Sequence, residues 1–318
     1  MPRIALVTYD PRPEPSRDGD LPVLLRALTD AGAEAEAVHW DDEDADWASY
    51  DLAVIRSTWD YSWRAAEFTA WAERCAKATR LANPVGVVRW NADKRYLGDL
   101  AAAGVPVVPT RYLAPEDAGD AGDAGGAGGA GGAEGAGGAG GAGNGFGLPV
   151  DHEYVIKPTS GAGARYAARY TPDRHDTAVR HLARLHEEGL TAMVQPYVRS
   201  IDTGGERALQ FFGGRLLHAS RKRAVLAPDT AFDEDKVAHP GLEPWTPAPA
   251  ELAVAERALA AVPEASGLLY ARVDLVTGDD GEPLVMELEL VEPNLFLFLH
   301  PGSVSRVAEA ILTAATTG

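Results

Sequence analysis

The sequence predicts an α/β protein in which a parallel sheet comes first and an α+β region follows. Over the first hundred residues, short apolar runs alternate with amphipathic segments, a pattern typical of βαβ units and a parallel sheet. Near the C-terminus, two apolar, β-branched runs flank a Gly/Asp turn, which is the pattern of a β-hairpin. A chain of 318 residues can form one large domain or two to three smaller ones.

The N-terminal elements follow from the positions of the apolar residues. A continuous apolar run such as residues 51–56 is typical of a parallel strand that is buried on both faces. In residues 63–79, Phe68, Trp71 and Cys75 lie three and four apart, as on one face of a helix. We therefore expect strands at 4–8, 35–40 and 51–56 and helices at 21–31 and 63–79.

The third strand runs into the segment Arg56-Ser-Thr-Trp-Asp-Tyr61. Open parallel sheets bind ligands beyond the carboxyl ends of their strands. The segment combines a guanidinium, two hydroxyls, a carboxylate and two aromatic rings, so one interpretation is a substrate loop that binds through Arg56, Ser57, Thr58 and Asp60. The alternative is a hydrogen-bonded turn whose Trp59 and Tyr61 pack against the core.

Asn91 is expected to be the N-cap of a helix that ends at Gly104. Lys94 then lies in the first turn of this helix. A cation at that position is unfavourable for the helix dipole, so a nearby anion is expected. A solvated lysine is the alternative.

Residues 119–145 contain only Gly and Ala with scattered Asp, Glu and Asn, so they predict a flexible insert and no hydrophobic core. Within them, residues 126–131 match the pattern G-x-G-x-x-G. A dinucleotide-binding site requires an apolar strand before this pattern, and none precedes it, so we reject that interpretation.

The next predicted strand, residues 152–157, ends in Lys157 and leads into the Gly-rich stretch Thr159–Ala164 and a second strand to Tyr170. A Gly-rich hairpin loop can direct its backbone N–H groups at phosphates. The sequence contains no Walker motif. In the helix expected at 174–187, His175, His181 and His186 lack metal-ligand spacing and are expected to be solvated.

The predicted C-terminal hairpin carries a set of charges. Side chains alternate between the faces of a strand, so Arg272 and Asp274 share one face, and Glu287 and Glu289 share another. If both faces point the same way, the three carboxylates repel one another unless protons or cations intervene. Mg²⁺ is the cation that best fits oxygen ligands of this kind. The alternative is an exposed edge with ordinary surface charges.

Composition excludes several classes of function. The net charge of −18 argues against nucleic acid as a partner, because nucleic-acid affinity depends on Lys/Arg–phosphate contacts. Cys75 is the single cysteine, which rules out an internal disulfide and favours a reducing compartment. The apolar run at residues 4–7 is too short for a signal peptide, and no run reaches the ~20 residues of a membrane helix. We therefore expect a cytoplasmic protein, while the oligomeric state stays open.

Taken together, these segments resemble the ATP-grasp superfamily of carboxylate–amine ligases over residues 85–118 and 150–312. The most specific likeness is Arg272-x-Asp274 followed by Glu287-x-Glu289, which is similar to the family's R-x-D…E-x-[NE] metal signature. The resemblance implies an N-terminal parallel-sheet domain, a small central lid domain and a C-terminal α+β domain, with ATP between the last two. Its expected boundaries are 1–90 for the N-terminal substrate domain, 91–118 for a linking helix and strand, 119–147 for the insert, 148–200 for the lid and 201–318 for the catalytic subdomain.

The resemblance also implies roles for individual residues. It implies Mg²⁺ on Asp274, Glu287 and Glu289, catalytic roles for Arg272 and Lys222, and ATP contacts at Lys94, Lys157, Ser160, Gly161, Gly163, Gln195, Tyr197, Val198 and Glu206. Lys222 belongs to the basic trio 221–223, for which solvated charges are the alternative. Gln195 and Glu289 depart from the family pattern, where many members have Glu and Asn.

The implied reaction is ATP-dependent ligation of an amino-acid-like carboxylate. The carboxylate attacks the γ-phosphate of ATP, and an amine-type nucleophile then displaces phosphate from the acyl phosphate. Residues 56–61, 221–223 and 287–296 are most similar to the branch that closes O-ureido-serine to cycloserine. Two alternatives remain open at this point, namely a nucleotide-binding regulatory module or pseudo-enzyme, and a metal-free acidic interaction protein.

Overall fold

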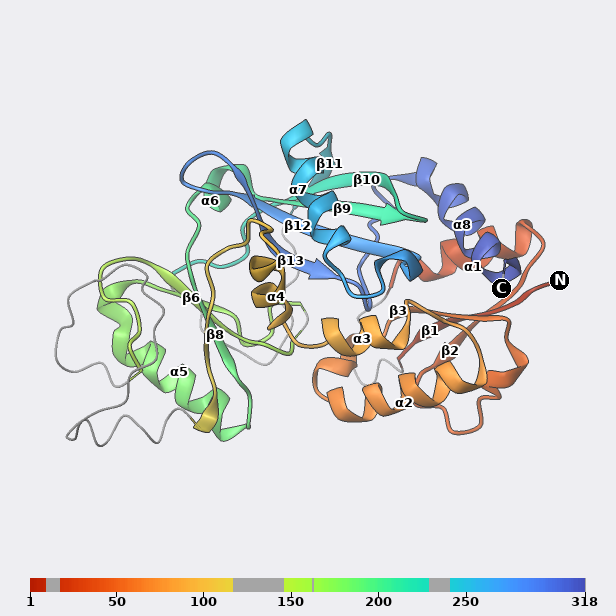
Figure 1. Ribbon diagram of the computed structural model, residues 1–318, viewed down its shortest axis with the longest axis horizontal. Coiled ribbons are helices and arrows are strands. Elements are labelled where there is room, and N and C mark those ends of the chain that lie inside the picture. The colour runs from red at the N-terminus through yellow and green to blue at the C-terminus, as the bar shows by residue number, and fades with distance from the viewer. Residues whose placement is uncertain (10–17, 117–145, 162, 229–240, 318) are drawn as a thin grey trace.

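The computed structural model describes residues 1–9, 18–116, 146–161, 163–228 and 241–317. Three sheets organise this part of the chain (Figure 1). The predicted Gly/Ala insert and the G-x-G-x-x-G match within it lie outside the described residues, except for Phe146 and Gly147.

The N-terminal sheet is parallel, in the strand order β2–β1–β3–β4. One face packs on α1 and α8, through residues such as Ile4, Leu24 and Ile311. The other face packs on α2 through Ile55, Phe68 and Trp71. The predicted βαβ arrangement is confirmed, with β1 Arg3–Thr8, β2 Glu34–His39, β3 Leu52–Ser57, β4 Leu81–Ala82, α1 Leu21–Asp30 and α2 Ala65–Ala78.

The prediction that Asn91 is the N-cap of a helix is wrong. Two short helices occupy this region, α3 Val85–Asn91 and α4 Tyr96–Ala102, and Asn91 is the last residue of α3. Its buried amide donates from Nδ2 to the Leu288 carbonyl at 2.8 Å and accepts from the Leu290 N–H at 2.8 Å. The Asn91 amide, which local helix propensity would place at an N-cap, therefore binds the backbone of residues 288–290. Lys94 lies between the two helices.

The central sheet is antiparallel, in the order β5–β8–β6–β7, with α5 packed on one face (Figure 1). Its elements are β5 Arg111–Leu113, β6 Tyr154–Pro158, β7 Ala168–Tyr170, β8 Ala192–Pro196 and α5 His175–Glu187. The expected Gly-rich hairpin loop joins β6 and β7. The expectation of solvated histidines is wrong for His181, which is fully buried with Nδ1 3.0 Å from the Tyr170 hydroxyl.

The C-terminal sheet is antiparallel, in the order β11–β10–β9–β12–β13. Short helix α6 precedes β9, α7 packs on one face of the sheet through Val254, Ala255 and Ala258, and α8 returns to the N-terminal sheet (Figure 1). The elements are α6 Ser200–Gly204, β9 Glu206–Phe212, β10 Arg215–Lys222, β11 Leu242–Trp245, α7 Pro249–Ala260, β12 Tyr270–Thr277, β13 Pro283–Glu289 and α8 Val304–Thr316. The predicted hairpin is thus β12–β13.

The N-terminal and C-terminal sheets share one hydrophobic core. Phe212, Leu269 and Tyr270 of the C-terminal region pack in the same cluster as Ile4 and Leu6 of β1. Asn83 also joins the two, because its Nδ2 donates to the Tyr270 and Leu290 carbonyls at 2.9 and 2.8 Å. This junction brings the carboxyl end of β3 close to the end of β13.

Candidate active site

One face of the C-terminal sheet carries a grid of polar side chains. Residues directly opposite each other on antiparallel strands project to the same side of a sheet. The register therefore gives three rows across β10, β9, β12 and β13, which together we call the polar face: His218–Gln210–Arg272–Glu289, Ser220–Ala208–Asp274–Glu287, and Lys222–Glu206.

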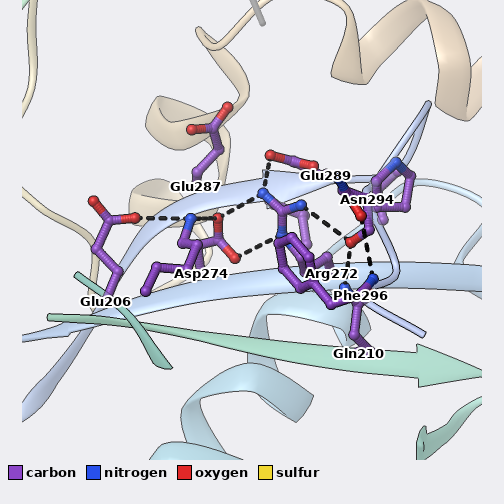
Figure 2. A network of polar contacts seen from close by, with 12 residues as sticks. Glu206, Gln210, Arg272, Asp274, Glu287, Glu289, Asn294 and Phe296 are labelled. Atoms are coloured by element: carbon purple, nitrogen blue, oxygen red, sulfur yellow. Dashed lines mark hydrogen bonds and ion pairs between the residues drawn. The ribbon is translucent and has the colours of Figure 1, made fainter. Parts of the chain in front are cut away.

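Asp274 is the centre of the polar face, with 1% of its surface exposed. Arg272 donates to it from Nε and Nη2, each at 2.9 Å, and Lys222 donates from Nζ at 2.6 Å (Figure 2). Burial alone raises the pKa of this carboxyl, but Arg272 and Lys222 outweigh burial and hold the pKa well below its usual range. Asp274 is therefore ionised, and both its oxygens are engaged.

Glu287 and Glu289 differ in charge environment although they lie two residues apart. Burial favours the neutral form of Glu287, but Lys94, with Nζ 3.1 Å from Oε1, and Lys157 bring its pKa below the usual value. Burial raises the pKa of Glu289 to about 8; its contact with Arg272 opposes this, and the nearby Asp274 and Glu287 add to the rise. The end of the polar face at Glu289 thus carries more negative charge than its cations neutralise.

The donor chemistry of this region suits a hard divalent cation. Two carboxylates at the ends of the rows, Glu287 and Glu289, are partly exposed, and Asp274 and Glu287 add to the burial that raises the pKa of Glu289. Within the described ranges, however, no three acidic, His or Cys side chains already surround a common point. Asp274 is engaged by Arg272 and Lys222. A bound cation would have to take the place of ammonium and guanidinium groups.

A cavity of about 130 Å³ lies against the polar face. Its walls are formed by Lys94, by residues of the central sheet and its Gly-rich loop, and by residues of the C-terminal sheet. Apolar side chains such as Val155 and Met286 lie beside the charged groups. Among the residues predicted from sequence, the lining includes Lys94, Lys157, Gly161, Gly163, Gln195, Tyr197, Val198, Glu206, Lys222, Arg272, Glu287 and Glu289. The structure therefore brings these residues together, and Asp274 lies beneath them.

The cationic end of the cavity is formed by Lys94 and Lys157. Burial lowers the pKa of Lys157, and Glu287 only partly opposes this. For Lys94, Glu287 and its neighbours outweigh burial and leave the pKa above its usual value. The Lys94 ammonium also contacts the Gly161 carbonyl of the Gly-rich loop. The Ser160 hydroxyl is buried and has no hydrogen-bond partner among the described residues. This end of the cavity can accept a polyanion.

Another part of the cavity lies at the carboxyl end of strand β8, and we call this part the β8 cleft. Gln195 donates from Nε2 to the Thr110 hydroxyl at 2.9 Å, which fixes its amide. Tyr197 is held by Asp202, which accepts from its hydroxyl at 2.6 Å, and by the Arg169 guanidinium 3.5 Å from its ring centre. Glu206 accepts from Lys222 at 2.8 Å. The alternative of solvated charges is therefore excluded for Lys222, whose ammonium is buried between two carboxylates.

The side chains of the segment after β3 lie in two different environments. Arg56 and Thr58 are fully buried, and the Ser57 hydroxyl lies 2.9 Å from that of Thr8 on β1. Burial, and then the nearby Glu292 and Glu287, raise the pKa of Tyr61 well above its usual value, so the segment faces the carboxylates. Asp60 points elsewhere: it accepts from Trp40 Nε1 at 2.9 Å and pairs with Arg64 at 3.4 Å.

Several polar residues near the site were not predicted from sequence, among them Asp20, Gln210 and Arg165. Gln210 lies directly opposite Arg272, so its place on the polar face follows once β9 and β12 are known to pair. Arg165 lines the cavity and donates from Nη1 to the Ser62 carbonyl at 3.4 Å, which joins the Gly-rich loop to the N-terminal region. No local motif marks Asp20.

Comparison with known proteins finds relatives that match most of the chain. Residues 4–83 match the family model "D-cycloserine synthetase DcsG, N-terminal domain". The chain is 39% identical over 301 residues to the cycloserine biosynthesis protein DcsG of Streptomyces lavendulae, covering 92% of this chain and 93% of that protein. The chain belongs to the DcsG family of ATP-grasp ligases.

Solved structures extend the comparison. The crystal structure of D-cycloserine synthetase DcsG matches with a TM-score of 0.81 and 36% identity, covering 99% of this chain and 100% of that one. D-alanine–D-alanine ligase from Bacillus anthracis matches with a TM-score of 0.62 at 16% identity over 100% of this chain and 98% of the ligase, which shows the fold. The predicted ATP-grasp fold is confirmed.

Membership of the family also determines the class of reaction. The chain is an enzyme, an ATP-dependent ligase that joins a carboxylate to an amine-type nitrogen. The alternatives of a pseudo-enzyme and of a metal-free interaction protein are not favoured, because the charged residues of the family signature are present and converge on one cavity. Among the described helices, none has the length and apolar character needed to cross a membrane.

Proposed function

We propose that this enzyme is a cyclo-ligase that activates the carboxylate of O-ureido-serine with ATP and closes it to cycloserine. The observation that carries the proposal is the 39% identity to DcsG over 92% of this chain. The depth of the site is a second support. Arg272 and Asp274 are almost fully buried, as a reaction that must exclude water requires.

ATP is proposed to bind along the cavity from the β8 cleft to the polar face. Gln195 and the backbone of Tyr197 and Val198 would hold the adenine, and Glu206 would hold the ribose. Lys94 and Lys157 would bind the phosphates. The Gly-rich loop at Ser160, Gly161 and Gly163 would cover them, since its backbone can approach an anion closely.

Mg²⁺ is proposed to bind at Glu287 and Glu289, with Asp274 as a third carboxylate beneath them. When bound, the cation neutralises phosphate charge during phosphoryl transfer. The supporting observation is that burial and neighbouring carboxylates raise the pKa of Glu289 to about 8. The residues fit the cation by charge and by ligand chemistry, while the arrangement of their oxygens would have to change from their contacts with Lys94 and Arg272.

The reaction itself depends mainly on positioning and on charge. The substrate carboxylate attacks the γ-phosphorus and ADP leaves. The nitrogen next to the substrate's chain oxygen then attacks the acyl carbon, and phosphate leaves. O-Ureido-serine carries a carbamoyl group on this nitrogen and cycloserine does not, so one water must also cleave the bond between this nitrogen and the carbamoyl carbon. The nitrogen keeps a proton, and the carbamoyl group leaves as carbon dioxide and ammonia.

Arg272 and Lys222 are the proposed catalytic residues. The guanidinium of Arg272 would stabilise the negative charge that develops on the acyl oxygen, and Asp274 keeps it oriented through two hydrogen bonds of 2.9 Å. Lys222, held between Asp274 and Glu206, would contribute positive charge near the transferred phosphoryl group. For the substrate, Arg56, Ser57 and Thr58 are the proposed binding residues nearest the carboxylates. Asp60 was also predicted to bind substrate, but its contacts with Trp40 and Arg64 favour a role in supporting this segment.

An ADP-release screen tests the proposal. Wild-type enzyme with ATP and Mg²⁺ is given O-ureido-D-serine, O-ureido-L-serine, serine, alanine and their hydroxamates. We expect ADP release to be fastest with one enantiomer of O-ureido-serine. Faster release with alanine, accompanied by a dipeptide, would contradict cyclisation and indicate ligation between two amino acids.

A further inference from the structure

Four side chains beside the polar face are buried yet keep polar atoms without a partner. They are Asp20, Arg56, Thr58 and Gln210, and each has at most 2% of its surface exposed. Among the described residues, no hydrogen-bond partner exists for Asp20 Oδ2, Arg56 Nε and Nη1, Thr58 Oγ1 or Gln210 Oε1. Buried polar groups are rarely left unpaired, because a polar atom that loses its hydrogen bond to water without gaining another destabilises the fold.

Three of these side chains hold the same stretch of backbone, residues 293–297. Arg56 Nη2 donates to the Pro293 carbonyl at 3.2 Å, and Gln210 Nε2 donates to the Asn294 carbonyl at 2.7 Å. Asp20 Oδ1 accepts from the Leu297 N–H at 2.9 Å. Each residue therefore uses one part of its polar group to hold this stretch and leaves the other part unpaired. The unpaired atoms belong to one locality at the junction of the N-terminal and C-terminal sheets.

This locality adjoins the reacting groups. Gln210 is directly opposite Arg272 across β9 and β12, and Arg272 itself donates to the Asn294 carbonyl (Figure 2). Arg56 is close enough to Asp20 to act on its charge: burial raises the pKa of Asp20, and Arg56 is the main influence that lowers it. The locality thus offers one negative group, one positive group and neutral donors and acceptors beside the Arg272 guanidinium.

We propose that Asp20, Arg56, Thr58 and Gln210 bind the amino-acid end of the substrate, and that Asp20 selects for the α-ammonium group. The inference rests on the proposed function, because it places this end next to the carboxylate that is activated. In an α-amino acid, one carbon separates the ammonium from the carboxylate. A site that binds the ammonium at Asp20 therefore brings the carboxylate toward Arg272.

The remaining atoms match the rest of such a ligand. The Nε and Nη1 groups of Arg56 can donate to substrate oxygen atoms, and Gln210 Oε1 can accept an N–H. The Thr58 hydroxyl can do either. A zwitterionic amino acid thereby pairs charges of both signs, whereas a simple carboxylic acid leaves Asp20 Oδ2 buried and without a partner among the described residues.

Asp20→Asn is the direct test, because the amide oxygen can still accept from the Leu297 N–H. Two substrates are compared in the ADP-release assay: O-ureido-serine and 3-(ureidooxy)propanoate, the same acid without the ammonium. For O-ureido-serine, we expect kcat/KM of Asp20→Asn to fall about 50-fold or more, the scale of losing a buried charge pair. For the desamino acid, the two enzymes should agree within about threefold.

Asp51→Asn is the matched control. The Asp51 carboxylate likewise accepts a backbone N–H, from Arg3 at 2.8 Å, but lies away from the polar face. Its kinetics should equal those of the wild type with both substrates. The melting temperature and the KM for ATP of each variant separate a binding effect from a folding effect.

An equal loss with both substrates, in an Asp20→Asn protein that is folded and binds ATP normally, would overturn the inference. If Asp20→Asn does not fold, the isosteric variant Thr58→Val tests the same locality. It should raise the KM for O-ureido-serine about tenfold without changing that for ATP, and an unchanged substrate KM would overturn the inference. If the wild type accepts a different amino acid, the proposed function fails, and the comparison is made with that amino acid and its desamino counterpart.

Discussion

The stability of the metal-free protein should change in opposite directions when Glu287 and Glu289 are each replaced by Gln. In the metal-free protein, Glu287 is paired with Lys94, and its pKa is below the usual value. Glu289 is the crowded carboxylate, with a pKa raised to about 8. We therefore expect Glu287→Gln to destabilise the metal-free fold and Glu289→Gln to stabilise it.

The size of the effect follows from the shift of Glu289. A folded pKa above the unfolded value means that this group contributes stability below pH 4.5, which is lost as the pH rises toward 8. At neutral pH the ceiling is about 4 kcal/mol, at about 1.4 kcal/mol per pH unit. The amide oxygen of Gln can still accept from Arg272. We expect a net gain of about 1–2 kcal/mol, or a rise in Tm of roughly 2–4 °C.

Two assays separate stability from catalysis. Thermal melting in the presence of a chelator at pH 7.5 gives the Tm of both variants and of the wild type. ADP release at saturating Mg²⁺ gives turnover, which should fall at least 100-fold for Glu287→Gln, as when one transition-state contact is lost. The reasoning is refuted if both variants shift the Tm in the same direction, or if Glu287→Gln retains more than about a tenth of wild-type turnover.

The remaining predictions concern the substrate segment, the histidines and the insert. Arg56→Ala should raise the KM for the carboxylate substrate or abolish turnover while ATP affinity changes by less than about threefold; equal losses of both would count against this assignment. Burial lowers the pKa of His181 and of His218, each to about 4, so the stability that they contribute is present above pH 6.5 and is lost as the pH falls toward 4. The Tm of His218→Gln should therefore depend less on pH than that of the wild type between pH 7 and 5, and parallel curves would contradict this. Deleting residues 120–143 should leave Tm and turnover near parental values, because shortening a predicted coil changes closure entropy only logarithmically, and a drop in Tm of about 10 °C would argue against a coil.

Local sequence patterns were sufficient for the elements and for the charged hairpin. Period-two alternation placed Arg272 with Asp274, and the antiparallel register then brought Glu287 and Glu289 to the same side. These patterns did not show that Lys94, 193 residues earlier, pairs with Glu287 and lowers its pKa, because this contact depends on the tertiary fold. Local patterns cannot determine such long-range pairing.

The errors have the same physical origin. Asn91 has the propensity of a cap, but its amide is used by β13. His181 is polar, yet the amphipathic face of α5 buries it beside Tyr170. Asp20 carries no motif and becomes part of a site only when the backbone of Leu297 reaches it. The environment of each residue is set by contacts that the tertiary fold makes and that its neighbours in the sequence do not reveal.

The most direct test of the account is the stoichiometry of the complete reaction. Wild-type enzyme is incubated with O-ureido-serine, ATP and Mg²⁺, and ADP and cycloserine are quantified together, with Glu287→Gln as the inactive control. The account predicts one cycloserine formed for each ADP released by the wild type and neither product above background in the variant. Release of ADP without the ring, or formation of an intermolecular amide in its place, would contradict it.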